Sequence, residues 1–163
     1  YDWAKAPDAN FKLRMTYGHV TDLKPRDAVR YDWRTVLDGM FEKESKTESD
    51  YFVNERLRQF YEKKDFGRYA REDGKLPTCF LSNNDITGGN SGSPVLNAKG
   101  SLIGLAFDGN WEAMSGDVAF EPALQRTISV DIRYVLFIID KFADAGYLVR
   151  EMTLVRDGKP VAE

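Results

Sequence analysis

Apolar and polar residues alternate at the start of the chain. From Phe11 to Tyr17 every second residue is apolar, and the residues between them are polar or charged. A period of two is typical of a half-buried β-strand, so residues 11–20 predict a first strand. After the turn LKPRD, the run DAVRYDWR (27–34) predicts a second strand.

The spacing of apolar residues becomes helical between residues 35 and 70. The runs TVLDGMFEKE and NERLRQFYEKKDF place apolar side chains on one face and charged side chains on the other, which is the pattern of an amphipathic helix. The polar run SKTESD lies between them and predicts a turn. We therefore expect a helical insertion over residues 35–72.

Short apolar runs return in the second half of the chain. GKLPTCFLSNNDI predicts a strand, PVLN and LIGLAF predict two strands joined by a short turn, and ISV predicts a further strand. The run DIRYVLFIIDKFADAG has an N-cap residue, Asp131, and a stop at Gly146, so we expect a helix over residues 131–146. LVREMTLV predicts a last strand.

Together these elements predict a mainly β fold with a helical insertion and a late helix. A chain of 163 residues with 42% hydrophobic residues fits one globular domain, which we expect to span residues 1–163. The net charge of −3 argues against a nucleic-acid groove, and no apolar run reaches the roughly 20 residues of a membrane span.

The content of cysteine and histidine excludes several kinds of site. Cys79 is the only cysteine, so an internal disulfide cannot form, and its apolar neighbours predict a buried thiol. The spacing of histidine, cysteine and carboxylate residues fits no metal site. We therefore expect neither a metal nor a cofactor.

The stretch TGGNSGSPV (87–95) concentrates small residues around one serine. An ordinary glycine- and serine-rich surface turn is one interpretation. The nucleophile elbow of α/β-hydrolases is excluded, because Ser93 stands where that motif has glycine and a strand rather than a helix follows. The segment GNSGSP instead matches the Gly-Asx-Ser-Gly-small-Pro loop of β-barrel serine peptidases at every position.

In such a loop the serine and the neighbouring backbone amides have defined chemical roles. Ser91 would be the acyl-accepting nucleophile, and the backbone N–H groups of Gly89 and Ser91 would converge on the developing oxyanion. A general base is also needed, and His19 is the only histidine. A lone histidine on a predicted strand is more often structural. We therefore expect the chain to lack its own base and to be inactive alone.

Three longer segments carry a more specific resemblance. NDITGGNSGSPV, LIGLAFDGNWEAMSGD and VDIRYVLFIIDKF occur in this order and resemble the C-terminal end of the bacterial dipeptidyl peptidases of family S46, of the dipeptidyl peptidase 7 and 11 types. The resemblance implies that this chain is the second barrel of a chymotrypsin-like double β-barrel. The catalytic histidine and aspartate of the family lie upstream, in a first barrel that accompanies a helical domain.

The resemblance also implies a biological setting. The family removes dipeptides from peptides with free N-termini, in the periplasm or at the outer surface of Gram-negative bacteria, and its members form homodimers. On these grounds we expect a serine-type dipeptidyl aminopeptidase when the chain is joined to its upstream barrel.

Site residues can be carried over position by position. Ser91 falls on the nucleophile of the family, and Gly89 and Ser91 fall on its oxyanion donors. Phe107 falls on the strand that lines the substrate, and Asp108 matches the acidic residue that holds the substrate's α-amino group. Gly109 stands where members that accept hydrophobic side chains have glycine and members that require Asp or Glu have arginine.

Two alternatives stay open at this point. Asp85 lies six residues before Ser91, where trypsin-like endopeptidases keep the carboxylate that binds Lys or Arg. The family has an equivalent segment without trypsin-like specificity, so Ile86 is the preferred pocket-wall residue. The other alternative is a non-catalytic β-barrel that binds peptide ends.

Overall fold

The computed structural model describes residues 13–115 and 120–161. These residues form two compact units. The first unit comprises Tyr1–Arg34, Cys79–Val95 and Gly104–Val130, and the second comprises Thr35–Thr78, Leu96–Ile103 and Asp131–Glu163. Each unit is described by itself below. In the described residues the secondary structure is mainly β, with sheets and few helices, as the sequence predicts.

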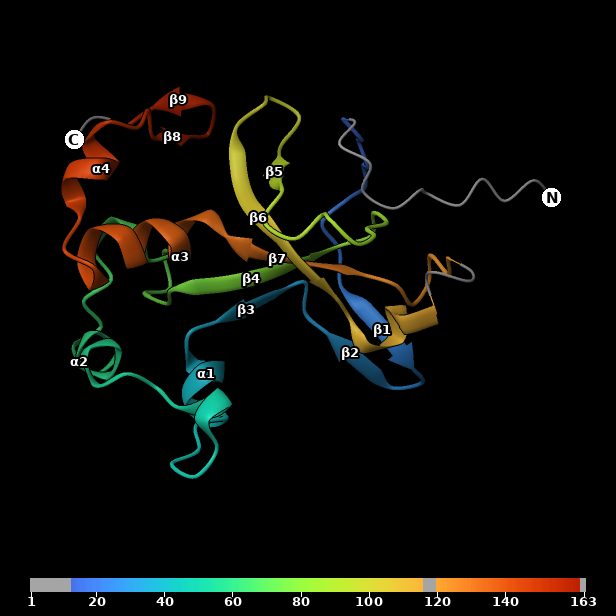
Figure 1. The fold of residues 1–163 in the computed structure, drawn as a ribbon, viewed down its shortest axis with the longest axis horizontal. Coiled ribbons are helices and arrows are strands. Elements are labelled where there is room, and N and C mark those ends of the chain that lie inside the picture. Colours follow the sequence, from blue (N-terminus) through green and yellow to red (C-terminus); the bar gives the residue numbers. More distant parts are fainter. Residues whose placement is uncertain (1–12, 116–119, 162–163) are drawn as a thin grey trace. The chain divides into compact units, whose positions relative to one another are not determined.

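A five-stranded sheet is the framework of the first unit. Most residues of this sheet belong to that unit. The strand order is β3-β4-β7-β6-β5 (Figure 1). The strands are β3 (Arg34–Val36), β4 (Pro77–Ser82), β5 (Pro94–Leu96), β6 (Leu102–Gly109) and β7 (Thr127–Asp131). β4 and β7 are antiparallel, and their register pairs Cys79 with Val130 and Ser82 with Thr127. Cys79 is half-buried, so the expectation of a buried thiol is wrong.

The second predicted strand is divided. β1 (Leu23–Arg26) and β2 (Val29–Tyr31) form an antiparallel hairpin, and Arg34 already belongs to β3. Ala28 adopts a φ of 58° in the hairpin turn. The run 27–34 therefore contributes to two strands rather than to one continuous strand.

The first predicted strand does not form over its described part. Residues 13–19 have no regular secondary structure, and Val20 makes only an isolated antiparallel bridge to Ser82. Met15 and Tyr17 are 86% and 87% exposed. A period of two determines which side chains would share one face of a strand, but a strand also needs a partner strand to pair with. Residues 11 and 12 lie outside the described residues.

Short helices provide much of the second unit. Residues 35–72 contain α1 (Asp38–Glu42), α2 (Glu55–Lys63) and the 3-10 turns η1 (Ser49–Tyr51) and η2 (Gly67–Tyr69). Asn54 caps α2, because its side-chain oxygen accepts a hydrogen bond from the N–H of Arg56 at 2.8 Å. A left-handed residue, Lys64, ends this helix.

The late helix differs from its expected single span. Asp131 caps α3 (Ile132–Phe137) as expected, but a π-helical turn, η4 (Ile138–Phe142), follows directly. Gly146 does not stop the helix but begins a new one, α4 (Gly146–Arg150), which replaces the start of the last predicted strand. The chain then forms a small hairpin of β8 (Val155–Arg156) and β9 (Lys159–Pro160).

The second unit has a continuous apolar core. Its buried members come from the insertion, from the residue before β4 and from α3, and they are Leu37, Val53, Leu57, Phe66, Tyr69, Leu76 and Phe137. Phe137 is 0% exposed. Its ring lies edge-on to those of Phe60 and Phe66, with centroids 5.5 and 5.8 Å away, a favourable arrangement for aromatic pairs.

Candidate active site

The loop between β4 and β5 contains two consecutive β-turns. The N–H of Asn90 donates to the carbonyl of Thr87 at 3.2 Å, and the N–H of Ser93 donates to the carbonyl of Asn90 at 2.9 Å. The third residue of each turn is a glycine with positive φ, 93° at Gly89 and 81° at Gly92. Type II turns require this conformation at their third residue, which explains the position of both glycines.

The second of these turns is held by a strand of the same unit. The N–H of Gly92 donates to the carbonyl of Ala106 on β6 at 2.7 Å, and the N–H of Ala106 donates to the carbonyl of Ser93 at 2.9 Å. Ser91 is the second residue of this turn and is exposed. The loop therefore presents the Ser91 hydroxyl on a backbone fixed by the sheet.

The two amide groups selected from the sequence are not used in the loop's own hydrogen bonds. Within residues 13–115 and 120–161, no hydrogen bond uses the N–H of Gly89 or Ser91. Asn90, which lies between them, donates its N–H within the first turn, and its side-chain oxygen accepts a hydrogen bond from the N–H of Thr87 at 3.1 Å. The turns thus satisfy the intervening groups and leave these two donors available to a ligand.

The end of β6 carries the other selected residues. Phe107 and Asp108 are exposed, and Gly109 is half-buried. The N–H of Gly109 donates to Oδ1 of Asp108 at 2.8 Å. A Cβ on Gly109 would lie 3.2 Å from the Cβ of Ala113, so even a small side chain would require a local shift.

Asn110 is a structural residue that sequence reasoning missed. Its Nδ2 donates to Glu112 at 2.7 Å and to the carbonyl of Leu124 at 2.8 Å, and its Oδ1 accepts from the N–H of Arg126 at 2.6 Å. These bonds fix the chain directly after Gly109. The asparagine that follows glycine at a strand end was the available signal, since such residues favour turns.

The remaining sequence candidates lie on less regular backbone. Asp85 and Ile86 are both half-buried in the segment between β4 and the first turn. His19 is exposed and pairs through its backbone with Asn83, at 2.7 Å to the side-chain oxygen and 3.1 Å from the Asn83 N–H. In the part of the chain that the structure describes, no hydrogen bond joins His19 to Ser91.

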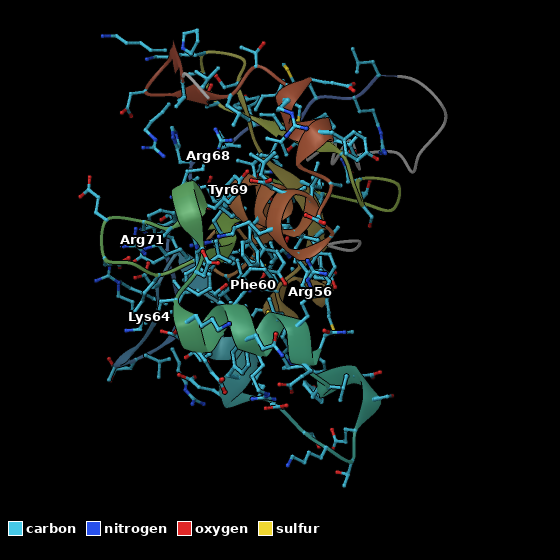
Figure 2. The ribbon with its side chains drawn as sticks, turned by 90° about the vertical axis from the view of Figure 1, so that its left-hand side faces the viewer. Arg56, Phe60, Lys64, Arg68, Tyr69 and Arg71 are labelled. Atoms are coloured by element: carbon cyan, nitrogen blue, oxygen red, sulfur yellow. The ribbon has the colours of Figure 1, made fainter. Side chains whose placement is uncertain are left out.

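The second unit has an open cleft of about 550 Å³. Its lining includes Arg56 and Phe60 from α2 and Arg68 and Tyr69 from η2, as Figure 2 shows. No residue selected from the sequence lines this cleft.

Several charged and polar groups of the cleft are bound to one another. The Tyr69 hydroxyl donates to Asp140 at 2.7 Å, Lys141 pairs with Asp65, and Arg56 donates to the carbonyl of Lys141 at 3.2 Å. Burial and then the hydrogen bond to Asp140 raise the pKa of Tyr69 to about 12. We interpret these contacts as polar packing of the second unit.

The described residues contain neither a metal-binding cluster nor a membrane-spanning helix. Among the described residues, no group of three or more His, Cys, Asp or Glu side chains is arranged to hold a metal ion. None of the described helices has the length and apolar character needed to cross a membrane.

Comparison with known proteins identifies the family of the chain. The chain is 58% identical over 151 residues to a dipeptidyl-peptidase 7 of Phocaeicola vulgatus, covering 93% of this chain and 21% of that protein. It is 53% identical over 150 residues to an Asp/Glu-specific dipeptidyl-peptidase of Capnocytophaga gingivalis, covering 92% of this chain and 21% of that one. The chain therefore spans about a fifth of the length of these relatives.

A solved structure gives the same result. The crystal structure of Porphyromonas endodontalis DPP11 in complex with the dipeptide Arg-Glu matches with a TM-score of 0.85 and 51% identity, covering 90% of this chain and 21% of that one. The family model described as Peptidase S46 matches residues 1–154. Because that match covers most of the chain, this protein belongs to peptidase family S46.

Proposed function

We propose that this chain is the second barrel of a chymotrypsin-like double β-barrel and supplies half of a serine dipeptidyl peptidase site. In this proposal a first barrel and a helical domain, carried by a longer polypeptide, supply the histidine and the aspartate. Membership of family S46 and the one-fifth share of the relatives' length support this arrangement. The exposed position of His19, without a hydrogen bond to Ser91 in the described residues, supports a base from elsewhere.

One observation carries the assignment of the nucleophile. An exposed serine is the second residue of the later of two glycine turns, and the geometry of these turns leaves the amides of Gly89 and Ser91 without an internal acceptor in the described loop. Ser91 would attack the scissile carbonyl, and the two amides would stabilise the oxyanion that forms. Removal of one such donor costs about 10²–10³ in kcat in enzymes of known mechanism, so the geometry of this loop matters chemically.

The end of β6 would recognise the substrate. Asp108 would bind the α-amino group, since a desolvated ammonium needs a nearby carboxylate, and this contact would restrict cleavage to free N-termini. Gly109 supplies no cation for an acidic side chain, so we propose a preference for hydrophobic residues before the cleaved bond. Phe107 and Ile86 would contribute the apolar walls.

The remaining parts of the proposal follow from the family resemblance. The substrates would be peptides with free N-termini, cleaved in the periplasm or at the outer surface of a Gram-negative bacterium. The full polypeptide would be a homodimer and would use no cofactor.

The role of Ser91 is tested first. We expect Ser91→Ala in the full-length polypeptide to reduce kcat for a dipeptidyl substrate by at least about 10⁴-fold, as loss of a serine nucleophile does elsewhere, with an unchanged melting temperature. A fluorophosphonate probe should label Ser91 in the full-length polypeptide but not in this chain alone. Full activity of the Ser91→Ala variant would exclude the proposed nucleophile.

Substrate selection separates the alternatives. Cleavage should be faster after Leu, Met or Phe than after Asp or Glu, and it should require a free amine. Faster cleavage after Arg, with blocked N-termini accepted, would support a trypsin-like endopeptidase and a binding role for Asp85. A full-length polypeptide that binds peptide ends but is neither labelled nor active would support the non-catalytic module.

A further inference from the structure

Arg14 connects the segment before β1 to the first turn of the candidate loop. Its Nη1 donates to the hydroxyl of Thr87 at 3.0 Å, and its Nη2 donates to the carbonyl of Gly88 at 3.3 Å. Arg14 is half-buried, and all three residues belong to the first unit. Thus one side chain, 74 residues away in sequence, binds the loop on the N-terminal side of Ser91.

The carbonyl that Arg14 binds belongs to a peptide group with two accessible orientations. The Gly88–Gly89 peptide is the central peptide of the turn Thr87–Asn90. Type I and type II turns differ in the orientation of this central peptide, which is reversed between them. The φ of 93° at Gly89 places the turn in the type II class.

The orientation of this peptide decides where the Gly89 N–H points. In a trans peptide the C=O of one residue and the N–H of the next point in opposite directions. A donor that binds the Gly88 carbonyl therefore directs the Gly89 N–H toward the opposite side. If this peptide were reversed, the Gly89 N–H would point to the side of the turn opposite to the one that it faces in this structure.

The sequence of the turn does not hold this orientation by itself. Glycine occupies both central positions, and a Cβ at Gly88 would meet nothing within 4 Å. Glycine adopts positive and negative φ with similar ease, so either turn type is accessible to this pair. An external contact is needed to select one of them.

The second turn provides a useful contrast. Its central peptide joins Ser91 to Gly92, and it is held from the N–H side by the bond to the carbonyl of Ala106. The central peptide of the first turn is held from the C=O side by Arg14. Arg14 makes its contact through a side chain, so a substitution can remove this contact without changing the backbone of the loop.

We propose that Arg14 is a positioning residue that holds the Gly88–Gly89 peptide in the orientation required of an oxyanion donor. This inference rests on the proposed function, in which the Gly89 amide binds the oxyanion. Arg14 touches neither the substrate nor the nucleophile in this role. It acts through the Gly88 carbonyl, and Thr87 fixes the other arm of its guanidinium.

The test uses the full-length polypeptide with Arg14→Met, Arg14→Lys and Thr87→Val. Arg30→Met is the matched control, since Arg30 is an arginine of the same unit that pairs with Asp22 instead of the loop. The measurements are kcat and KM for a dipeptidyl substrate and inhibition by two ligands. A dipeptide aldehyde forms a tetrahedral oxyanion on Ser91, whereas the product dipeptide does not.

We expect Arg14→Met to lower kcat and aldehyde affinity by a similar factor of about 10–100, approaching the loss seen when an oxyanion donor is deleted. KM and affinity for the product dipeptide should change by less than about threefold, because a ground-state complex uses this donor weakly. Arg14→Lys should restore part of the loss and Thr87→Val should cause a smaller one. Arg30→Met should match the wild type.

The outcomes distinguish this inference from the proposed function. Wild-type kcat and aldehyde affinity in folded Arg14→Met, beside an inactive Ser91→Ala, would overturn the role of Arg14 and leave the nucleophile assigned. If Arg14→Met does not fold, an unchanged ratio of aldehyde to product affinity in both Arg14→Lys and Thr87→Val would overturn it. Activity that survives Ser91→Ala would overturn both proposals.

Discussion

The two units of this chain use different interactions for their most informative regions. In the second unit, aromatic and aliphatic side chains pack around Phe137, which is 0% exposed. In the first unit, the candidate site consists of turns and backbone hydrogen bonds, and its aromatic residue Phe107 is 58% exposed. Side-chain packing therefore stabilises the core of the second unit, whereas backbone turns and hydrogen bonds fix the conformation of the candidate site in the first unit.

A pair of phenylalanine substitutions gives the largest expected difference in stability. Phe137→Ala should lower the free energy of unfolding by about 3–5 kcal/mol, because it leaves a cavity among rings that cannot close around it. Phe107→Ala should change it by less than about 0.5 kcal/mol, since the side chain is exposed. Urea denaturation of the full-length polypeptide measures both. Equal losses would mean that Phe107 is also a packing residue.

Substitutions at two glycines, one in each unit, test how much space the backbone leaves for a side chain. A Cβ on Gly104 of β6 would lie 2.5 Å from the carbonyl oxygen of Val130 and 2.6 Å from the Phe80 ring. Gly104→Ala should therefore destabilise the fold by about 1–3 kcal/mol through overpacking. Gly39 in α1 has nothing within 4 Å of the same atom, so Gly39→Ala should stabilise it by about 0.5–1 kcal/mol.

Thermal unfolding of the two glycine variants provides the measurement. Opposite shifts in melting temperature are expected. A neutral Gly104→Ala would show that the sheet adjusts easily beside the candidate site, and the contrast between the two regions would then be weaker.

A further expected effect concerns the hydroxyl of Tyr69, a buried residue of the apolar core. Tyr69→Phe should cost about 1–2 kcal/mol at pH 8, because the hydrogen bond to Asp140 is lost. The folded pKa of Tyr69, about 12, exceeds its ordinary value of 10.0. The folded state therefore favours the neutral hydroxyl, and this contribution is complete below pH 10 and is lost as the pH rises toward 12.

The pH dependence isolates this contribution. The difference in unfolding free energy between the wild type and Tyr69→Phe should shrink by about 1 kcal/mol between pH 8 and pH 11, since one pKa unit corresponds to roughly 1.4 kcal/mol. Urea denaturation at both pH values gives the two differences. A constant difference would indicate that the hydroxyl titrates normally.

Local patterns predicted the elements whose causes are local. The side chain of Asp131 caps α3, and the apolar runs around Phe80 and Ala106 form β4 and β6. The lack of strand structure in residues 13–19 was not predicted, because strand pairing involves distant residues, and the helix that begins at Gly146 was not predicted, because a glycine after a helical run is also a stop signal. A Cβ on Gly146 would lie 2.6 Å from Oδ1 of Asp140, so this glycine permits a close approach rather than ending a helix.

The candidate site shows the same division. The glycine pattern around Ser91 indicated a special turn, and the structure has two turns there with positive φ at Gly89 and Gly92. The chemical roles of these residues remain predictions. Arg14 could not be connected to the loop from sequence, because no local pattern relates a side chain to a carbonyl 74 residues away.

The π-helical turn after α3 affects how the chain tolerates changes in length. The N–H of Ala143 donates to the carbonyl of Ile138 at 2.8 Å, so this turn contains one residue more than an α-helical turn. Asp140 and Lys141, which bind Tyr69 and Asp65, lie within it. Deleting one residue here would restore regular helix but rotate the following side chains by about 100°, so indels in homologous chains should avoid this turn.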